Sequence, residues 1–188
     1  MFYTRKNTAI TRALAFCKCL YNESGEKVSN QFVCDGFYTY YLQEDGTAMR
    51  DRLTYHPDGV HLIYFDEYGH ECFDKFQYCE DVAYTCYFNT YGYALFNEEV
   101  FYHESPYYLD GAGRMVMYEW FTFANGVDRG FADASGCLVN FGFYVDEYGR
   151  TIYMNWDGTV ARGLIQDADY YYQMDGTDGH LLGKFEKQ

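Results

Sequence analysis

The feature that most constrains the fold of this chain is a glycine that recurs about every 22 residues. It closes a short unit of aromatic residues followed by a turn, as in YYLQEDG and IYFDEYG. The aligned glycines are Gly25, Gly46, Gly69, Gly92, Gly113, Gly136, Gly158 and Gly179, and they are separated by 21, 23, 23, 21, 23, 22 and 21 residues. A fixed period of this length is the sequence signature of a repeat protein, in which each period forms one small structural unit.

Each period contains two turns and two short extended runs. A second glycine lies about halfway through several of the periods, at Gly36, Gly59, Gly126 and Gly149. Asp-Gly and Asn-Gly turns supply the positive φ that β-hairpins need, and the runs between them, such as VHLIYF, are rich in β-branched and aromatic residues. We therefore expect an all-β fold, a repeat solenoid of about eight stacked β-hairpins over residues 19–188. A lead-in of residues 1–18 would carry at most one short helix, around Thr8 to Leu20.

The composition also indicates a thin repeat array. The chain has 23 tyrosines, 16 phenylalanines and 2 tryptophans, but only 25 leucines, isoleucines and valines together. A compact core is built mainly from branched aliphatic residues. Tyrosine suits places that are half buried, where the ring packs and the hydroxyl meets water. One hairpin of about 22 residues cannot bury its own apolar face, so it must stack on its neighbours.

The charge excludes several classes of partner. The formal net charge is −14, which argues against nucleic acid and against anionic membranes. No run of 18 apolar residues is present that would span a membrane. The N-terminal segment has basic residues at Arg12 and Lys18 inside its apolar stretch and no small-residue cleavage site, so we interpret it as the start of a folded fragment rather than a signal peptide.

Neither metal binding nor catalysis is indicated by the sequence. The seven cysteines are an odd number without a C-x-x-C pair, and we expect buried or spectator thiols. The acidic turns are explained by turn preference, and no calcium-binding loop motif is present. No nucleophile elbow, phosphate loop or cysteine–histidine signature is found. We therefore expect no metal, no cofactor and no enzymatic activity.

With the repeats aligned, the chain resembles the cell-wall-binding repeats of choline-binding and glucan-binding type. These occur in Gram-positive surface proteins, phage lysins and clostridial toxins, and read roughly G-W-x(4–5)-G-x-W-Y-Y-F-D-x-x-G. The segments that match best are ARGLIQDADYYYQMDGTDGHLLGKF, from Ala161 to Phe185, and DGFYTYYLQEDGTAMRD, from Asp35 to Asp51. The resemblance extends over nearly the whole chain from about Cys19 onward.

The resemblance implies shallow sites between successive hairpins, walled by aromatic rings and sometimes a methionine. Such rings hold quaternary ammonium by cation–π attraction or sugars by stacking. This chain departs from the pattern because it has only two tryptophans, with Leu164 and Tyr170 where the final unit would carry its pair. A glycan ligand, or a degenerate repeat that only spaces or assembles, is therefore favoured over choline binding at most junctions. The candidate ligand-binding residues are Trp120, Phe121, Trp156, Tyr170, Tyr171, Tyr172 and Met174.

Each candidate also has an interpretation as a packing residue. Trp120 is either an exposed platform or a ring that closes the gap between hairpins, and strand alternation places Phe121 on the opposite face. Trp156 lies in the turn MNWDG, where exposure is favoured. The tyrosines and Met174 suit packing and ligand binding equally.

Two functions follow from these features. The first is a non-catalytic cell-wall or carbohydrate-binding module that attaches a surface or secreted bacterial protein to wall polymer or another glycan. The second is a structural spacer or protein-interaction solenoid, for instance one that forms a homodimer or an adhesin surface. The resemblance implies an extracellular, cell-surface location.

Overall fold

The computed structural model describes residues 20–188, which form β-strands joined by turns. The lead-in of residues 1–18 and the helix expected there lie outside the described residues. The strands are β1 (Gln31–Cys34), β2 (Thr39–Leu42), β3 (Arg52–Tyr55), β4 (Leu62–Phe65), β5 (Lys75–Cys79), β6 (Tyr84–Phe88), β7 (Glu98–Tyr102), β8 (Ser105–Leu109), β9 (Glu119–Thr122), β10 (Arg129–Ala132), β11 (Gly142–Val145), β12 (Thr151–Met154), β13 (Gly163–Gln166), β14 (Tyr170–Met174) and β15 (Leu181–Glu186).

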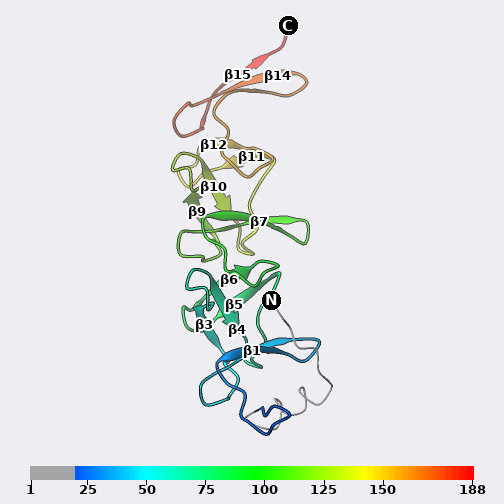
Figure 1. Cartoon of the computed structure of the whole chain (residues 1–188). Coiled ribbons are helices and arrows are strands. Elements are labelled where there is room, and N and C mark those ends of the chain that lie inside the picture. Colours follow the sequence, from blue (N-terminus) through cyan, green and yellow to red (C-terminus); the bar gives the residue numbers. More distant parts are fainter. Residues whose placement is uncertain (1–19) are drawn as a thin grey trace. The chain divides into compact units, whose positions relative to one another are not determined.

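Consecutive strands pair as antiparallel hairpins, and each hairpin is a separate small sheet (Figure 1). Six of the described sheets have two strands, and the last has the three strands β13, β14 and β15. This confirms the expected all-β repeat of hairpins. The eight main glycines and the four secondary ones all have positive φ, as the turn chemistry predicts.

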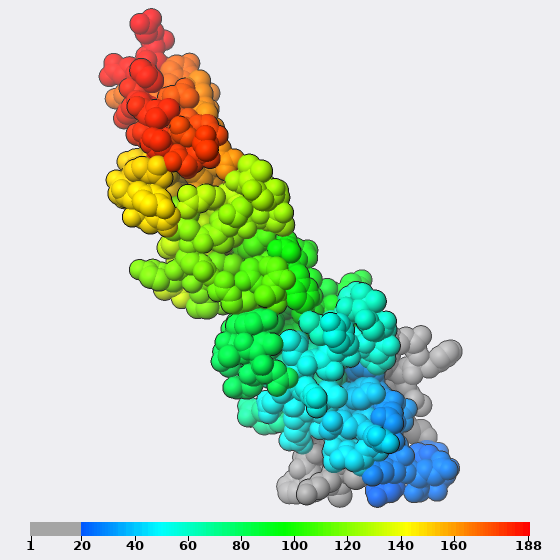
Figure 2. Space-filling model, turned by 90° about the vertical axis from the view of Figure 1, so that its left-hand side faces the viewer, coloured from blue at the N-terminus to red at the C-terminus, as the bar shows by residue number. Residues whose placement is uncertain are grey.

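The chain divides into two compact units, which we call the N-terminal unit (to Leu95) and the C-terminal unit (Phe96–Gln188). In the C-terminal unit the green, yellow, orange and red bands follow the order of the sequence (Figure 2). Each hairpin there lies next to the hairpins that precede and follow it, as expected for a repeat array.

The same turn construction recurs after hairpins of both units. In the N-terminal unit Asp66 Oδ1 accepts hydrogen bonds from the backbone N–H groups of Tyr68 and His70, at 2.9 and 2.8 Å. The N–H of Gly69 donates to the Asp66 carbonyl at 2.8 Å. In the C-terminal unit Asp133 accepts in the same way from Ser135 and Cys137. An Asp or Asn side chain that bonds its own following backbone is what fixes these turns.

At Gly69 and Gly179, glycine is required for a second reason besides its positive φ. A Cβ atom on Gly69 would lie 3.0 Å from the Met49 carbonyl oxygen, and one on Gly179 would lie 2.6 Å from the Ala161 carbonyl oxygen. These two turns therefore rest directly on the backbone that follows the preceding turn. The secondary glycines Gly59 and Gly149 have nothing within 4 Å of the same position, so only their backbone conformation favours glycine.

Successive hairpins are joined by a backbone hydrogen bond as well as by packing. At two junctions of each unit, the residue two positions after the turn glycine donates its N–H to a carbonyl in the second strand of the preceding hairpin. The bonds in the N-terminal unit are Glu71 to Thr39 and Ala94 to Leu62, and those in the C-terminal unit are Leu138 to Pro106 and Val160 to Arg129, all at 2.8 Å. The two bonded residues are thus about one and a half periods apart in both units.

The apolar side chains between hairpins form several small clusters instead of one core. The largest in the N-terminal unit is Tyr64, Cys72, Cys79, Cys86, Phe88 and Ala94. Clusters in the C-terminal unit are Tyr108, Val116, Ala132 and Leu138, and then Ile152, Met154 and Val160. The described cysteines form no disulfide, and they are buried at three positions and half-buried at Cys34 and Cys137. None of the described segments is a helix long and apolar enough to cross a lipid bilayer.

Candidate ligand-binding surfaces

Trp120 lies on β9 and is half-buried. Its ring packs on Phe131, its cross-strand partner, with the ring centroids 5.1 Å apart. The Arg129 guanidinium lies 5.0 Å from the indole centroid and also contacts Glu147 at 3.2 Å. Trp120 therefore has a packing role together with a partly exposed ring, and Arg129 already occupies a cation–π position over it.

Phe121, the next residue, points to the other face of β9 as strand alternation predicts. It stacks on Tyr108 at 4.7 Å with an interplanar angle of 17°. Its ring also covers Gly130, where an added Cβ would meet the phenylalanine Cζ at 2.8 Å. Phe121 is thus held between neighbouring side chains of the C-terminal unit.

Trp156 follows β12 in the turn that ends at Gly158, and 76% of its surface is exposed. This confirms the exposure that its place in the turn predicts. The backbone carbonyl of Trp156 accepts a hydrogen bond from the Asn140 amide at 3.3 Å. The turn is therefore held in place while the indole projects outward.

The β14 residues Tyr170, Tyr171, Tyr172 and Met174 differ widely in exposure. Met174 is fully buried, and Tyr172 is only 7% exposed, with its hydroxyl donating to Asp167 at 2.6 Å. Tyr170 is half-buried and Tyr171 is exposed. The seven residues expected to bind ligand therefore lie on three separate elements, β9, the turn after β12, and β14, each with its own partners.

The structure adds a set of aromatic residues in the N-terminal unit that we did not predict as a site. Tyr38, just before β2, stacks on His70 with centroids 3.8 Å apart and an interplanar angle of 7°. Tyr68 stacks on the same imidazole at 5.7 Å. Tyr38 and Tyr68 remain 48% and 60% exposed. We call Tyr38, His70 and Tyr68 the first stack.

The same arrangement recurs one period later. His61, just before β4, stacks on Tyr93 at 3.9 Å with an angle of 9°. Tyr91, which is 74% exposed, lies 6.2 Å from Tyr93. We call His61, Tyr93 and Tyr91 the second stack. Two successive junctions therefore present a three-ring surface built from equivalent positions.

Equivalent positions explain the likeness of the two stacks. In each, one ring comes just before the second strand of a hairpin, and the other two flank the turn glycine of the next period. The first and second rings are about one and a half periods apart in both cases, the spacing that the bonds from Glu71 to Thr39 and from Ala94 to Leu62 impose. The signal in the sequence is a pair of aromatic residues at this separation, which is visible only once the stacking offset is known.

Carboxylates lie beside both stacks. Asp66 Oδ2 lies 3.5 Å from His70 Nδ1, and Asp58 Oδ2 lies 2.7 Å from His61 Nδ1 and 2.9 Å from His56 Nδ1. The hydrogen bond from His61 holds the pKa of Asp58 well below its usual range. Each stack thus combines exposed ring surface with a neighbouring carboxyl group as acceptor, which suits sugar hydroxyls and cationic groups.

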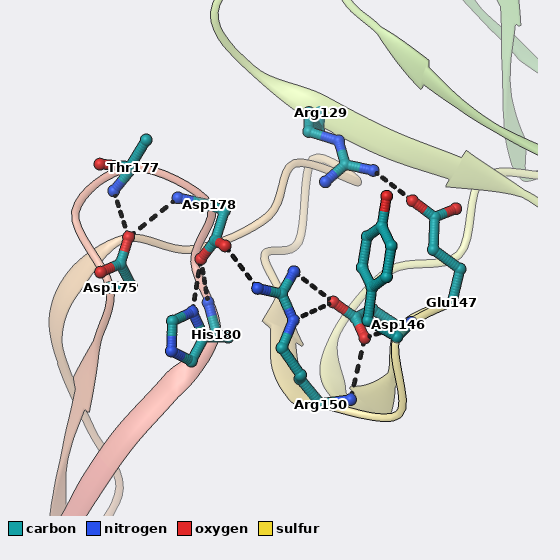
Figure 3. A network of polar contacts seen from close by, with 9 residues as sticks. Arg129, Asp146, Glu147, Arg150, Asp175, Thr177, Asp178 and His180 are labelled. Carbon is teal, nitrogen blue, oxygen red and sulfur yellow. Dashed lines mark hydrogen bonds and ion pairs between the residues drawn. The ribbon is translucent and has the colours of Figure 1, made fainter.

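At one of the corresponding junctions in the C-terminal unit, charged side chains take the place of the stacked rings (Figure 3). Arg150 donates to Asp146 at 2.7 Å and to Asp178 at 2.6 Å, and Asp178 contacts His180 at 2.5 Å. Burial raises the pKa of Asp146, but hydrogen bonds from Arg150 and the turn amides outweigh it and hold this pKa below its usual range.

The same network includes the one described group of side chains with spacing suited to a metal ion, namely Asp175, Asp178 and His180. Asp175 already accepts two backbone N–H bonds, from Thr177 and Asp178. Because Arg150 also neutralises Asp178, the group is satisfied internally, and we assign no metal to it.

Comparison with known proteins gives matches among solved structures alone. No protein-family model matches the sequence, and no curated protein does. Choline-binding protein F from Streptococcus pneumoniae superposes with a TM-score of 0.66 at 20% identity, over 87% of this chain and 54% of that one. In the presence of a peptidoglycan analogue, the same protein gives 0.64 at 22% identity, over 84% and 53%.

A second protein of Streptococcus pneumoniae, CbpJ, superposes with a TM-score of 0.61 at 17% identity, over 77% of this chain and 49% of that one. The present chain spans about half the length of these proteins. The likeness shows that the chain has the fold of choline-binding repeat proteins. It confirms, at the level of the fold, the resemblance inferred from the repeats.

Proposed function

We propose that this chain is a non-catalytic repeat module that binds cell-wall polymer or another glycan through aromatic surfaces at its hairpin junctions. The observation that carries the proposal is the recurrence of the same three-ring stack at two successive junctions of the N-terminal unit. Exposed aromatic rings that gather on a surface mark interaction sites. A surface that repeats along the chain suits a ligand that itself repeats, such as a polysaccharide.

Repetition also explains how shallow surfaces would give useful affinity. One ring on one cation or sugar contributes only about 0.5–2 kcal/mol. When two linked surfaces bind one polymer, the second binding event is intramolecular, and the overall affinity can rise about 10²-fold or more. The outer rings Tyr68 and Tyr91 occupy the same place in their periods and are both exposed, so they are the residues expected to meet the polymer first.

Charge narrows the ligand class. The chain carries a net charge of −14, and Asp58 and Asp66 lie directly beside the stacked histidines. A polyanion would be repelled there. The preferred ligand is a glycan that offers hydroxyl groups or cationic substituents, and choline is one such substituent.

The C-terminal unit would contribute through its own exposed rings. Trp156 and Tyr171 are open to solvent, and Trp120 is open in part. Phe121, Tyr172 and Met174 would support them from beneath. The related choline-binding proteins and the peptidoglycan analogue used with one of them support a wall-polymer partner and a cell-surface location for this chain as well.

A spacer role is the second candidate, and the ionic junction of the C-terminal unit favours it. Arg150 and its partners fill the place where the N-terminal unit exposes rings. On this alternative the C-terminal unit would serve to extend or assemble a larger protein without binding small ligands.

The test is co-sedimentation with Gram-positive cell walls, with and without free choline, and with walls stripped of secondary polymers. The double variant Tyr68→Ala/Tyr91→Ala should raise the apparent Kd for the walls about tenfold, which corresponds to about 1.4 kcal/mol, and so lower the retained fraction. Tyr55→Ala is the matched control, because Tyr55 is an exposed tyrosine of the same unit outside the stacks. Equal retention of the wild type and the double variant would contradict the proposal, and so would failure of the wild type to sediment.

A further inference from the structure

Two imidazoles share one carboxylate in the turn that joins β3 and β4. The Asp58 Oδ2 atom lies 2.7 Å from His61 Nδ1 and 2.9 Å from His56 Nδ1. The other oxygen of the same carboxylate, Oδ1, accepts the backbone N–H groups of Val60 and His61 at 2.8 and 3.1 Å. The turn therefore fixes the carboxylate through one oxygen and leaves the second oxygen facing both rings.

The position of His56 allows two hydrogen bonds that exclude each other. Besides lying 2.9 Å from Asp58 Oδ2, its Nδ1 atom lies 3.2 Å from the backbone nitrogen of Asp58, whose N–H points toward it. A ring nitrogen that accepts a hydrogen bond must lack a proton, and one that donates to a carboxylate must carry one. A proton taken up at His56 Nδ1 therefore replaces the bond from the Asp58 backbone by a bond to the Asp58 carboxylate.

Both imidazoles also contact the second stack. His61 is a member of it and lies face to face with Tyr93, with the ring centroids 3.9 Å apart. His56 meets Tyr93 edge-on at 5.6 Å, and it lies 5.6 Å from Phe32 of β1. A cation over the face of an aromatic ring is attracted to it. Protonation of His61 is therefore compatible with an intact stack.

The charge of this turn depends on pH. The hydrogen bond from His61 holds the pKa of Asp58 well below its usual range, so the carboxylate remains charged in weak acid. Imidazole is the side chain that ordinarily changes its charge between pH about 5 and 8. With both rings neutral, the group formed by His56, Asp58 and His61 carries one negative charge. With both rings protonated, two positive charges and one negative charge leave one positive charge.

Three other titratable groups face this turn from the segments that follow β4. They are the phenols of Tyr91 and Tyr93 and the carboxyl group of Glu71, one oxygen of which lies 3.1 Å from the place that a Cβ atom on Gly92 would take. Burial raises the pKa of Glu71 to about 7. Glu71 therefore loses negative charge as the pH falls, in the same direction as the imidazoles gain positive charge. Phe32, which reaches the turn from β1, is uncharged.

We propose that His56, Asp58 and His61 form a proton-operated switch that reverses the charge beside the second stack, from negative at pH about 8 to positive at pH about 5, while the rings stay stacked. The first stack has one imidazole, His70, beside the carboxyl group of Asp66, so protonation there only cancels the charge. The two stacks therefore match in charge at neutral pH and differ in acid. The consequence for a ligand rests on the proposed function: in acid, the second stack would favour polymer segments that bear phosphate or carboxylate groups.

The local charge can be measured on the free protein with two small nitroxide probes, one cationic and one anionic, added in separate NMR experiments. Each probe speeds the relaxation of nearby protons in proportion to its local concentration, which the electrostatic potential controls. Between pH about 8 and about 5, the ratio of the cationic to the anionic effect should fall about fivefold at Tyr91 and Tyr93. It should fall only about twofold at Tyr38 and Tyr68, where a single charge changes.

Variants assign the difference to the imidazoles. His56→Asn removes one of the two rings and should reduce the change at the second stack to about twofold. Glu71→Gln removes the neighbouring carboxyl group and should leave the difference between the two stacks in place. His103→Asn is the matched control, because His103 lies in the C-terminal unit, and it should leave both ratios as they are in the wild type.

Equal changes at the two stacks of the wild type would overturn the proposal, and this comparison holds even where a variant fails to fold. Loss of the nuclear Overhauser contacts between His61 and Tyr93 at pH about 5 would also overturn it, because the rings would then have separated. A difference that disappears in Glu71→Gln would assign the change to that carboxyl group instead. No wall is present in these measurements, so this inference can fail while wall binding succeeds, and the reverse.

Discussion

The two units of the molecule share the same backbone geometry at their hairpin junctions but carry different side chains there. At matching junctions the N-terminal unit places Tyr38 on His70 and His61 on Tyr93, whereas the C-terminal unit places Arg150 beside Asp178 and His180. The inter-hairpin backbone bond is 2.8 Å long in both units. The backbone thus sets the geometry of a junction without dictating the chemistry of its exposed edge.

The largest predicted effect on stability comes from substituting the turn glycines that both units share. Gly69→Ala in the N-terminal unit and Gly179→Ala in the C-terminal unit should each lower the free energy of unfolding by about 2–4 kcal/mol. Each substitution combines an unfavourable positive φ with a clash against backbone. Urea unfolding, followed by NMR signals from the affected unit, measures the loss.

Matched controls are available in both units. Gly59→Ala and Gly149→Ala have the same positive φ but open space around the new methyl group, so each should cost about 1–2 kcal/mol. If all four substitutions lower the free energy of unfolding equally, the close contact between one turn and the preceding backbone makes no contribution. The glycines would then be needed only for their backbone conformation.

The next effect concerns Glu71, where the units differ in their response to pH. Glu71 lies two residues after the turn glycine Gly69. Most other described periods carry an apolar side chain at this position. Burial raises the pKa of Glu71 to about 7. A raised carboxyl pKa means that its contribution to stability is complete below the unfolded value of about 4.5 and is lost as pH rises through about 7. Glu71→Gln should therefore stabilise the N-terminal unit by about 2 kcal/mol at pH about 8 and have little effect at pH about 4.

Asp146 provides the opposite sign in the C-terminal unit. Its folded pKa is depressed, so its contribution is present above the unfolded value and is lost as pH falls through the folded value. Unfolding measured against pH for Glu71→Gln and Asp146→Asn should show opposite trends. A pH-independent difference between Glu71→Gln and the wild type would contradict the first assignment.

Breaking a stack should have a smaller effect. A double-mutant cycle on Tyr38→Ala and His70→Ala should give a coupling free energy of about 0.5–1.5 kcal/mol, the contribution of one well-stacked ring pair. Ser105→Ala and Cys137→Ala occupy the matching positions in the C-terminal unit and should show coupling near zero. Similar coupling in both cycles would mean that the junction stiffens both pairs regardless of side chain.

The smallest stability effect is expected at Trp156. Because 76% of its surface is exposed, Trp156→Ala should change the free energy of unfolding by less than about 0.5 kcal/mol. Thermal unfolding monitored by circular dichroism checks this. A large loss would show that the indole packs on its neighbours in solution, and would remove it from the set of rings available to a ligand.

Most of the fold could be predicted because it depends on interactions between residues that are close in sequence. The period, the turn glycines with positive φ and the paired strands all depend on residues within a few positions of one another, such as Asp66 and Gly69. The third strand of the last sheet was not predicted. It follows the last turn where an earlier period would continue with a new hairpin, and nothing in its sequence specifies pairing with β14.

The candidate site was less predictable, since it depends on which residues meet across a junction. Tyr38 and His70 are ordinary residues in their own segments and become a pair only through the offset of about one and a half periods between stacked hairpins. Conversely, Tyr172 and Met174 look like a ligand wall in sequence, yet the inward face of β14 buries them. Trp156 was predicted correctly as exposed, because a turn leaves little for a large ring to pack against.

The backbone hydrogen bond that links successive hairpins within each unit has a consequence for how such a chain can change in length. The bond joins backbone atoms, so it is indifferent to the identity of the side chains on either side. Within a unit, duplication or excision of one whole period, cut at equivalent glycines, would restore the same bond between new neighbours. A gene that encodes this arrangement can therefore gain or lose junctions with exposed rings one period at a time, and recombination alone would decide which rings come to face each other.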